Sequence, residues 1–268
     1  MSKKISEQKR KRLVLISGSI SIMLFMIVVL IANMTMNLFP PYLKTLIEYF
    51  NFDVVTPVES INVVFTVISG FSTIVCGYYA DQFLRKFILA GGTLLFSIFT
   101  LLIVFVPEGR LGYRIFFIFY AFCGIGIGAL VPTIFSLVGD IVKSEKRSIM
   151  MSYLTAAMFL GGVIGGMYGN TIVSSGGQWQ YGYFYLGLIS LIFGVTFLFI
   201  KEPKRGSSEE ELKEVLAGAE YRYSFSKKDL KTLKSNKSNY WLIINFIDTF
   251  PGAIILQYIY FYFDEKHN

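Results

Sequence analysis

Long apolar segments, separated by short polar ones, run along most of the chain. Seven of them are 20 residues or longer, and a helix needs about 20 mostly apolar residues to cross the hydrocarbon layer of a bilayer. Their apolar residues cover all faces of a helix, whereas the strands of a membrane barrel alternate apolar with polar residues. The pattern therefore predicts an all-α membrane protein with seven spanning helices, over residues 13–37, 56–79, 87–106, 113–138, 149–173, 181–200 and 240–263.

The polar segments divide the chain into four parts. Residues 1–12 form a basic N-terminus, and residues 13–201 contain the first six spans. Residues 202–239 form a polar loop with two capped, amphipathic stretches, which indicate short surface helices. Residues 240–268 hold the seventh span and the C-terminal end. The first apolar segment is longer than the apolar part of a signal peptide, about 7–15 residues, so we expect it to be retained as a span.

The composition agrees with a membrane location and excludes several classes of protein. Hydrophobic residues make up 54% of the chain and charged residues 16%, compared with roughly 25% charged residues in a soluble domain. Cys76 and Cys123 lie within spans, where we expect them to be packing residues. The sequence contains no cluster of histidine, cysteine and acid, no paired carboxylates inside a span and no phosphate-binding loop in water. We therefore expect no enzyme, no metal and no cofactor.

The distribution of Lys and Arg predicts the orientation of the chain. Loops on the cytoplasmic side of a membrane carry an excess of these residues. If the N-terminus is cytoplasmic, nearly all of the 25 Lys and Arg residues fall on that side, and the exceptions are Lys44, Arg110, Arg114 and Lys266. We expect a multi-pass protein of the cell membrane with a cytoplasmic N-terminus. The same asymmetry explains the net charge of +7 without nucleic acid as a partner.

A set of small and charged residues follows the second span. Asp81 and Arg85 are four residues apart, so on a helix they would share a face and pair, and Lys86 follows directly. Gly77 lies four residues before Asp81 and would let another helix approach that face closely. The ordered spacing favours a specific role over a simple positive flank.

This spacing resembles the signature of the major facilitator superfamily, G-x-x-x-D-x-x-x-R-K. The resemblance implies a six-helix bundle built as a three-plus-three inverted repeat, and transport of a small organic solute by alternating access. It also implies a conformational latch at Gly77, Asp81, Arg85 and Lys86. A companion charge cluster after the fourth span would comprise Asp140, Glu145 and Arg147.

Two further features extend the resemblance and limit it. The exit of the sixth span, residues 202–206, is similar to that of the spinster branch, whose members move lipid-like substrates. Tyr120 stands where many members of the superfamily carry an arginine, and the proline usual in the fifth span of antiporters is absent. Arginine-assisted proton coupling and antiport are therefore not inferred.

Glycines in the spans indicate close packing of helices. Gly161, Gly165 and Gly169 recur every four residues along the fifth span, a spacing that lets two helix backbones approach closely. We expect these glycines to be packing residues. The glycines of the fourth span lie inside lipid, where a dinucleotide-binding loop has no place.

Few polar residues inside the spans could contact a solute. Asp248 is the one ionisable residue deep in a span, and such residues usually mark a function, here a protonation or cation site. Pairing with another helix is the alternative. Asn33, Asn37 and Asn245 are further cavity candidates, although buried amides also join helices.

Two questions stay open at this point. The superfamily builds a transporter from two six-span halves, whereas this sequence ends at residue 268. We expect either a truncated reading frame or a separately encoded C-terminal half, and the odd number of spans argues against a dimer. A non-transporting membrane scaffold or sensor, acting through residues 202–239, is the alternative function.

Overall fold

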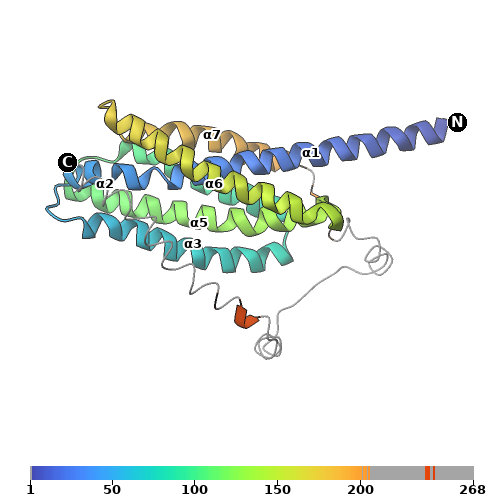
Figure 1. The fold of residues 1–268 in the computed structure, drawn as a ribbon, viewed down its shortest axis with the longest axis horizontal. Coiled ribbons are helices and arrows are strands. Elements are labelled where there is room, and N and C mark those ends of the chain that lie inside the picture. The colour runs from blue at the N-terminus through green and yellow to red at the C-terminus, as the bar shows by residue number, and fades with distance from the viewer. Residues whose placement is uncertain (1, 201, 204, 206–238, 242–243, 245–268) are drawn as a thin grey trace. The chain divides into compact units, whose positions relative to one another are not determined.

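The computed structural model describes residues 2–200, 202, 203, 205, 239–241 and 244, with side chains from residue 18 onward. The chain divides into two compact units, Met1–Tyr221 and Arg222–Asn268. The described part of the first unit is helical throughout (Figure 1). In the second unit, residues 239–241 and 244 are helical, and the rest of the seventh predicted span lies outside the described residues, as do Asn245 and Asp248.

Six stretches of the described chain are long and apolar enough to cross a membrane, which confirms the first six predicted spans as apolar helices. The described elements are α1 (Ser2–Met36), α2 (Phe39–Tyr49), α3 (Thr56–Gln82), α4 (Arg85–Leu102), the 3-10 turn η1 (Ile103–Phe105), α5 (Gly109–Ile141), α6 (Ser144–Ser174) and α7 (Gln180–Phe199).

The first span continues beyond its predicted end. It ends as a single helix at Met36, and α2 then carries the apolar stretch on to Tyr49. Pro40 and Pro41 stand in the first turn of α2, where a missing N–H is tolerated and the fixed φ suits a helix. The helix thus ends within one residue of the predicted end at residue 37, but the apolar stretch does not, because α2 adds an apolar face that is buried: Phe39, Tyr42, Leu43 and Leu46.

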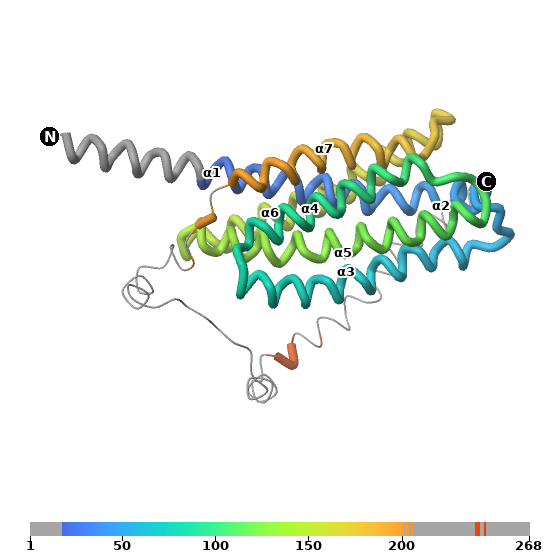
Figure 2. The backbone as a smooth tube through the Cα atoms, turned by 180° about the vertical axis from the view of Figure 1, so that it is seen from behind, coloured from blue at the N-terminus to red at the C-terminus, as the bar shows by residue number. Residues whose placement is uncertain are grey.

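The helices pack in a pattern that repeats within the bundle. α5 packs against α3 and α4, while α1 packs against α6 and α7, and α4 lies along α7 (Figures 1 and 2). The first three spans are α1 with α2, α3 and α4, and the last three are α5, α6 and α7. When each span is exchanged for the corresponding span of the other set, the pair α3–α5 becomes α6–α1, and the pair α4–α5 becomes α7–α1.

Glycines bring the backbones of these pairs close together. A Cβ atom added at Gly161 or Gly165 of α6 would collide with the carbonyl oxygen of Leu30 or Met34 in α1, and one at Gly169 would lie 2.7 Å from Cγ of Pro41. The three glycines are buried, and each lies where α6 crosses the first span.

The glycines of α5 serve two neighbours in turn. A Cβ at Gly124 or Gly128 would strike backbone oxygens of α3, whereas one at Gly126 would lie 2.6 Å from the Gly92 oxygen of α4. Residues two apart on a helix point to nearly opposite sides, so α5 fits tightly between α3 and α4.

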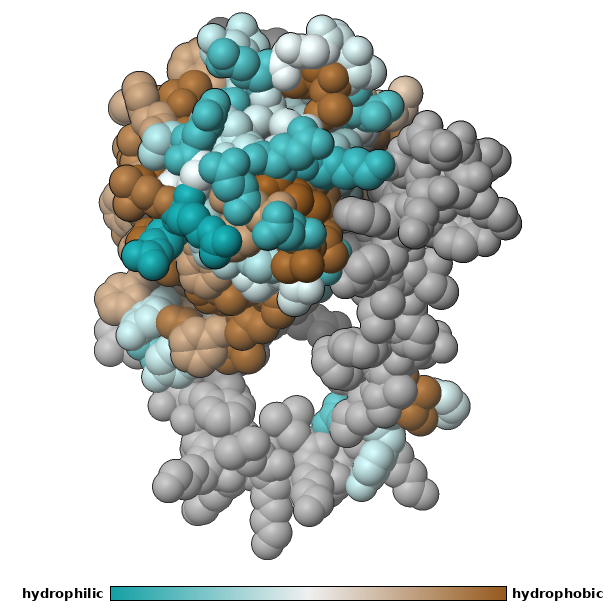
Figure 3. Space-filling view, turned by 90° about the vertical axis from the view of Figure 1, so that its left-hand side faces the viewer, coloured by the Kyte–Doolittle hydropathy of each residue, from teal (hydrophilic) through white to brown (hydrophobic). Residues whose placement is uncertain are grey.

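Polar and apolar residues separate along the bundle. The end opposite the N-terminus gathers hydrophilic side chains, and apolar side chains extend along the flanks behind it (Figure 3). Exposed polar residues at this end are Lys44, Glu48, Asn51, Asp53, Glu108 and Arg110. An apolar flank with a polar end is the distribution expected of a bundle that crosses a bilayer.

Candidate functional site

The turn between α3 and α4 lies at the end of the bundle that carries the predicted latch. α3 ends at Gln82, Phe83 and Leu84 are extended, and α4 begins at Arg85. Asp81 and Arg85 therefore do not share a helix face, and the predicted pair is not formed. Within the described chain, no hydrogen bond or ion pair joins the Asp81 carboxylate to Arg85, and the Asp81 side chain is exposed.

Arg85 is the centre of a buried cluster. Its residue is 2% exposed. Its Nη1 lies 2.5 Å from Oδ2 of Asp140, near the end of α5, and its Nε lies 3.3 Å from Oε1 of Glu202, beyond the end of α7. Nη1 also donates to Oγ of Ser136, at 3.0 Å, and Nη2 to the carbonyl oxygen of Pro203, at 3.4 Å. One guanidinium thus joins α4 to α5 and to the chain that follows α7.

Glu202 also caps the start of α4. Its Oε1 accepts a hydrogen bond from the backbone N–H of Arg85 at 3.0 Å, and its Oε2 accepts one from the N–H of Lys86 at 3.4 Å. The first amides of a helix have no partner within the helix, and an acid there interacts favourably with the helix dipole. Glu202 therefore supplies both a counter-charge and a cap.

Arg205 caps the other side of the same turn. Its Nη2 donates to the carbonyl oxygens of Ala80, at 2.7 Å, and of Phe83, at 3.0 Å, and its Nη1 donates to the Asp81 carbonyl oxygen. The last carbonyls of a helix lack intrahelical partners, and basic side chains can bind them. Glu202 and Arg205, three residues apart, thus hold both helix ends that form the turn.

The sequence of residues 202–206 indicated a family resemblance, but it did not predict that these residues belong to the site. The signal available was an acid and an arginine three residues apart, directly after a span and on the same side as the α3–α4 turn. Charges of both signs at that position could bind the two opposite helix ends. The distance in sequence, over 100 residues from the turn, concealed the contact.

The other predicted latch residues occupy different positions around the cluster. Nη2 of Arg147 donates to the carbonyl oxygen of Gly139 at 2.8 Å, beside Asp140. Glu145 is exposed in the first turn of α6. The ammonium of Lys86 lies 4.8 Å from the centre of the Phe87 ring. A Cβ at Gly77 would be 3.9 Å from Cβ of Pro132, an ordinary contact, so no described helix approaches Gly77 closely.

The cavity candidates on the first span bind their own helix. Nδ2 of Asn33 donates to the carbonyl oxygen of Val29, and Nδ2 of Asn37 donates to that of Asn33, both at 2.9 Å. Both asparagines are half-buried. Tyr120, in the place where an arginine is common, is 2% exposed and packs in the core, 4.7 Å between ring centres from Phe65.

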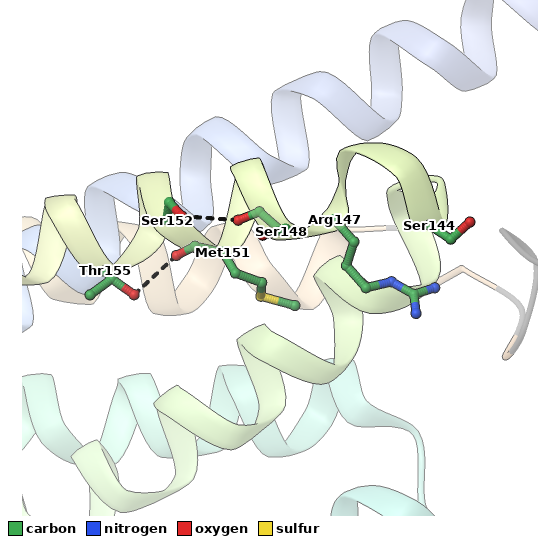
Figure 4. Close-up of a pocket in the computed structure, with 6 residues that line it drawn as sticks. All are labelled: Ser144, Arg147, Ser148, Met151, Ser152 and Thr155. Atoms are coloured by element: carbon green, nitrogen blue, oxygen red, sulfur yellow. Dashed lines mark hydrogen bonds between the residues drawn. The ribbon is translucent and has the colours of Figure 1, made fainter.

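A groove of about 690 Å³ follows the first half of α6. Hydroxyl side chains line much of it (Figure 4), and Ser152 and Thr155 bond to carbonyl oxygens one turn earlier, both at 3.0 Å. The lining residues are Ser144, Arg147, Ser148, Met151, Ser152 and Thr155. α3 and α6 are the least buried of the six spans, so both helices present a broad accessible face.

Removing the carboxylate of Glu202 should loosen the start of α4. In Glu202→Ala, the amides of Arg85 and Lys86 lose their acceptor, and a lost cap typically costs about 1 kcal/mol. Hydrogen–deuterium exchange in detergent should be faster in the peptide that begins α4. Glu145→Ala removes an exposed acid from the first turn of α6 and should leave that peptide unchanged. Equal exchange in both variants would contradict the capping role.

The sequence model described as Major Facilitator Superfamily matches residues 8–267. Among curated proteins, the sphingosine-1-phosphate transporter SPNS2 of Danio rerio is 31% identical over 135 residues, which are 50% of this chain and 26% of that protein. The gentisate transporter of Corynebacterium glutamicum is 26% identical over 141 residues, 52% of this chain and 31% of that protein. The matched region thus spans less than a third of either relative.

Solved structures share the fold. A bacterial homologue of the lysosomal transporter spinster, inward-facing and occupied, aligns with a TM-score of 0.58 at 15% identity, over 71% of this chain and 46% of that one. The inward-open xylose transporter XylE from E. coli aligns with a TM-score of 0.61 at 14% identity, over 75% of this chain and 53% of that one.

Proposed function

The chain belongs to the major facilitator superfamily, and we propose that it takes part in transport of a small organic solute across the cell membrane by alternating access. The described bundle would supply one six-helix half of the transporter. The observation that carries this proposal is the Arg85 cluster together with the Arg205 caps, which tie the ends of α3, α4 and α5 and the exit of α7 together at one end of the bundle.

The cluster has the properties of a conformational latch. A buried guanidinium shared by two carboxylates has a discrete paired arrangement, because separating the charges without new partners is costly. Packed helix ends held in this way switch between states and do not deform gradually. The exposed Asp81 and Glu145 would contribute to the latch by contacts with the second half of the transporter.

The solute would pass along the accessible faces of α3 and α6. The hydroxyl-lined groove on α6 supports this assignment, because hydroxyls can bind polar parts of a solute without carrying a charge into the membrane. We propose Asn33, Asn37, Asn245 and Asp248 as cavity residues, with Asp248 as the protonation or cation site. The second half of the transporter would complete the cavity.

The proposed orientation places the N-terminus and the latch in the cytoplasm. The excess of Lys and Arg on that side supports it. An amphiphilic organic molecule is the proposed class of solute, supported by the similarity to a sphingosine-1-phosphate transporter and by the spinster-like residues 202–206. The scaffold or sensor alternative is not favoured, because the similar proteins are named as transporters.

Solute flux in cells that carry the gene tests the function. We expect deletion of the gene to reduce the flux of one labelled solute from a panel that includes sphingosine-1-phosphate, gentisate and xylose. The intact gene should restore that flux, and a gene with Asp140→Asn should restore less, because this change weakens the latch. A deletion that alters the flux of no amphiphile, acid or sugar in the panel would contradict transport.

A further inference from the structure

An apolar groove of about 570 Å³ lies at the same end of the bundle as the Arg85 cluster. Four of its lining side chains, Tyr79, Phe83, Leu84 and Phe87, are between 47% and 60% exposed. The groove runs between the end of α3 and the start of α4, and its lining residues are Cys76, Tyr79, Phe83, Leu84, Phe87 and Ile88.

The position of the groove determines what can fill it. It lies where two spans end, and the end of a span is where we expect the lipid hydrocarbon to meet the headgroups, a depth at which aromatic side chains are enriched. Phe83 and Leu84 form the turn itself, a place where an aqueous loop would carry polar residues. Clustered exposed apolar side chains mark a surface that something apolar covers, and at this depth lipid chains are available.

Two cations flank the groove. The Lys86 ammonium lies over the face of Phe87, 4.8 Å from the ring centre, and the Arg205 guanidinium binds the Phe83 carbonyl oxygen at 3.0 Å. Arg85, the third cation at this turn, already has two carboxylate partners. Lys86 and Arg205 are thus the positive charges next to the apolar lining.

Asp81, an acid of α3 that takes no part in those ion pairs, points away from the groove. Asp81 is two residues from Tyr79 and five from Cys76 on α3, and successive residues of a helix turn by about 100°. Its side chain therefore leaves α3 on the face opposite the groove lining. The groove and its rim consequently combine an apolar floor with positive charge.

We propose that this groove binds one acyl chain of an anionic phospholipid from the adjacent leaflet, with the lipid phosphate held by Lys86 and Arg205. The lipid would cover the apolar turn and add a further contact between the ends of α3 and α4. This site is independent of the transported solute and of the assignment of transport.

Lipid binding to the purified, delipidated chain in detergent tests the proposal by native mass spectrometry. We expect one dioleoyl phosphatidylglycerol to bind more tightly than dioleoyl phosphatidylcholine. Lys86→Gln should weaken phosphatidylglycerol binding about fivefold, since a basic residue near anionic lipid contributes roughly 1 kcal/mol. Lys146→Gln, which removes an exposed lysine of α6 at the same end, should not change it.

Two further measurements separate the groove from a general charge effect. Cys76→Trp fills the apolar floor and should weaken binding of phosphatidylglycerol while all cations remain. Inorganic phosphate should not compete, because it lacks the acyl chain. Equal loss in Lys86→Gln and Lys146→Gln, undiminished binding in Cys76→Trp, or displacement by inorganic phosphate would overturn the proposal.

Discussion

Replacing Arg85 with alanine is expected to destabilise the bundle more than any other single charge substitution in the described chain. Asp140 and Glu202, whose side chains are only 16% and 12% exposed, would keep their carboxylates without the guanidinium that binds them. Breaking a buried ion pair by removing one partner typically costs about 3–5 kcal/mol. The melting temperature of Arg85→Ala in detergent should fall well below that of the native chain, and flux in complemented cells should fall with it.

The neighbouring lysine provides a matched control. Lys86→Ala removes a positive charge one residue further along the same turn, but its ammonium contacts only an aromatic face in the described part of the chain, worth about 0.5–1 kcal/mol at an exposed site. A similar loss of stability in both variants would show that net charge matters and that the Arg85 geometry does not.

A second comparison separates stability from the proposed switching role. In the triple variant Arg85→Met, Asp140→Leu and Glu202→Leu, no buried charge of the cluster remains, and such apolar replacements are often neutral or stabilising. We expect it to be more stable than Arg85→Ala but to restore no flux. Restored flux would show that the ion pairs only stabilise the fold.

Gly165→Ala is expected to give a severe packing defect between α6 and α1. The added methyl group would collide with the Met34 carbonyl oxygen, and the Cα and carbonyl carbon of Met34 lie directly behind that oxygen. Overpacking a tight core typically costs about 1–3 kcal/mol, and more where the obstacle cannot move. Because all of these Met34 atoms belong to the backbone of a helix, we expect a loss of stability at or above the top of that range. The loss would be measured as a lower melting temperature and a less monodisperse protein.

Gly70→Ala is the control for this prediction. A Cβ at Gly70 meets nothing within 4 Å, and alanine is a better helix former than glycine by about 1 kcal/mol. Its melting temperature should equal or exceed that of the native chain. If both alanine variants lost the same stability, the close contact of α6 with α1 would not be what stabilises the pair.

Features encoded locally could be predicted from the sequence, and features that depend on distant contacts could not. The apolar segments predicted seven helices, of which the first six are confirmed in the described chain, because each has to bury or face lipid along its whole length. The pairing of Asp81 with Arg85 failed because the prediction assumed a continuous helix, whereas the chain turns at Phe83 and Leu84. The caps that stabilise this turn come from Glu202 and Arg205, and no local pattern around residues 81–85 could reveal them.

The candidate site shows the same limit. Arg85 and Asp140 were named separately, as parts of two motifs, and only the packing of α4 on α5 brings them to 2.5 Å. The spacing of Gly161, Gly165 and Gly169 indicated a close helix contact, although the partner, α1, could not be read from it. The sequence therefore indicated which residues take part in both contacts, but not which residues they contact.

The contact of α6 with α1 has a consequence for biosynthesis. The ribosome completes α1 more than 100 residues before α6 begins at Ser144, so the surface around Leu30 and Met34 that receives the glycines enters the membrane without its partner. During that interval, lipid or an insertion factor has to occupy the surface. The bundle can close only after the fifth span has left the translocon.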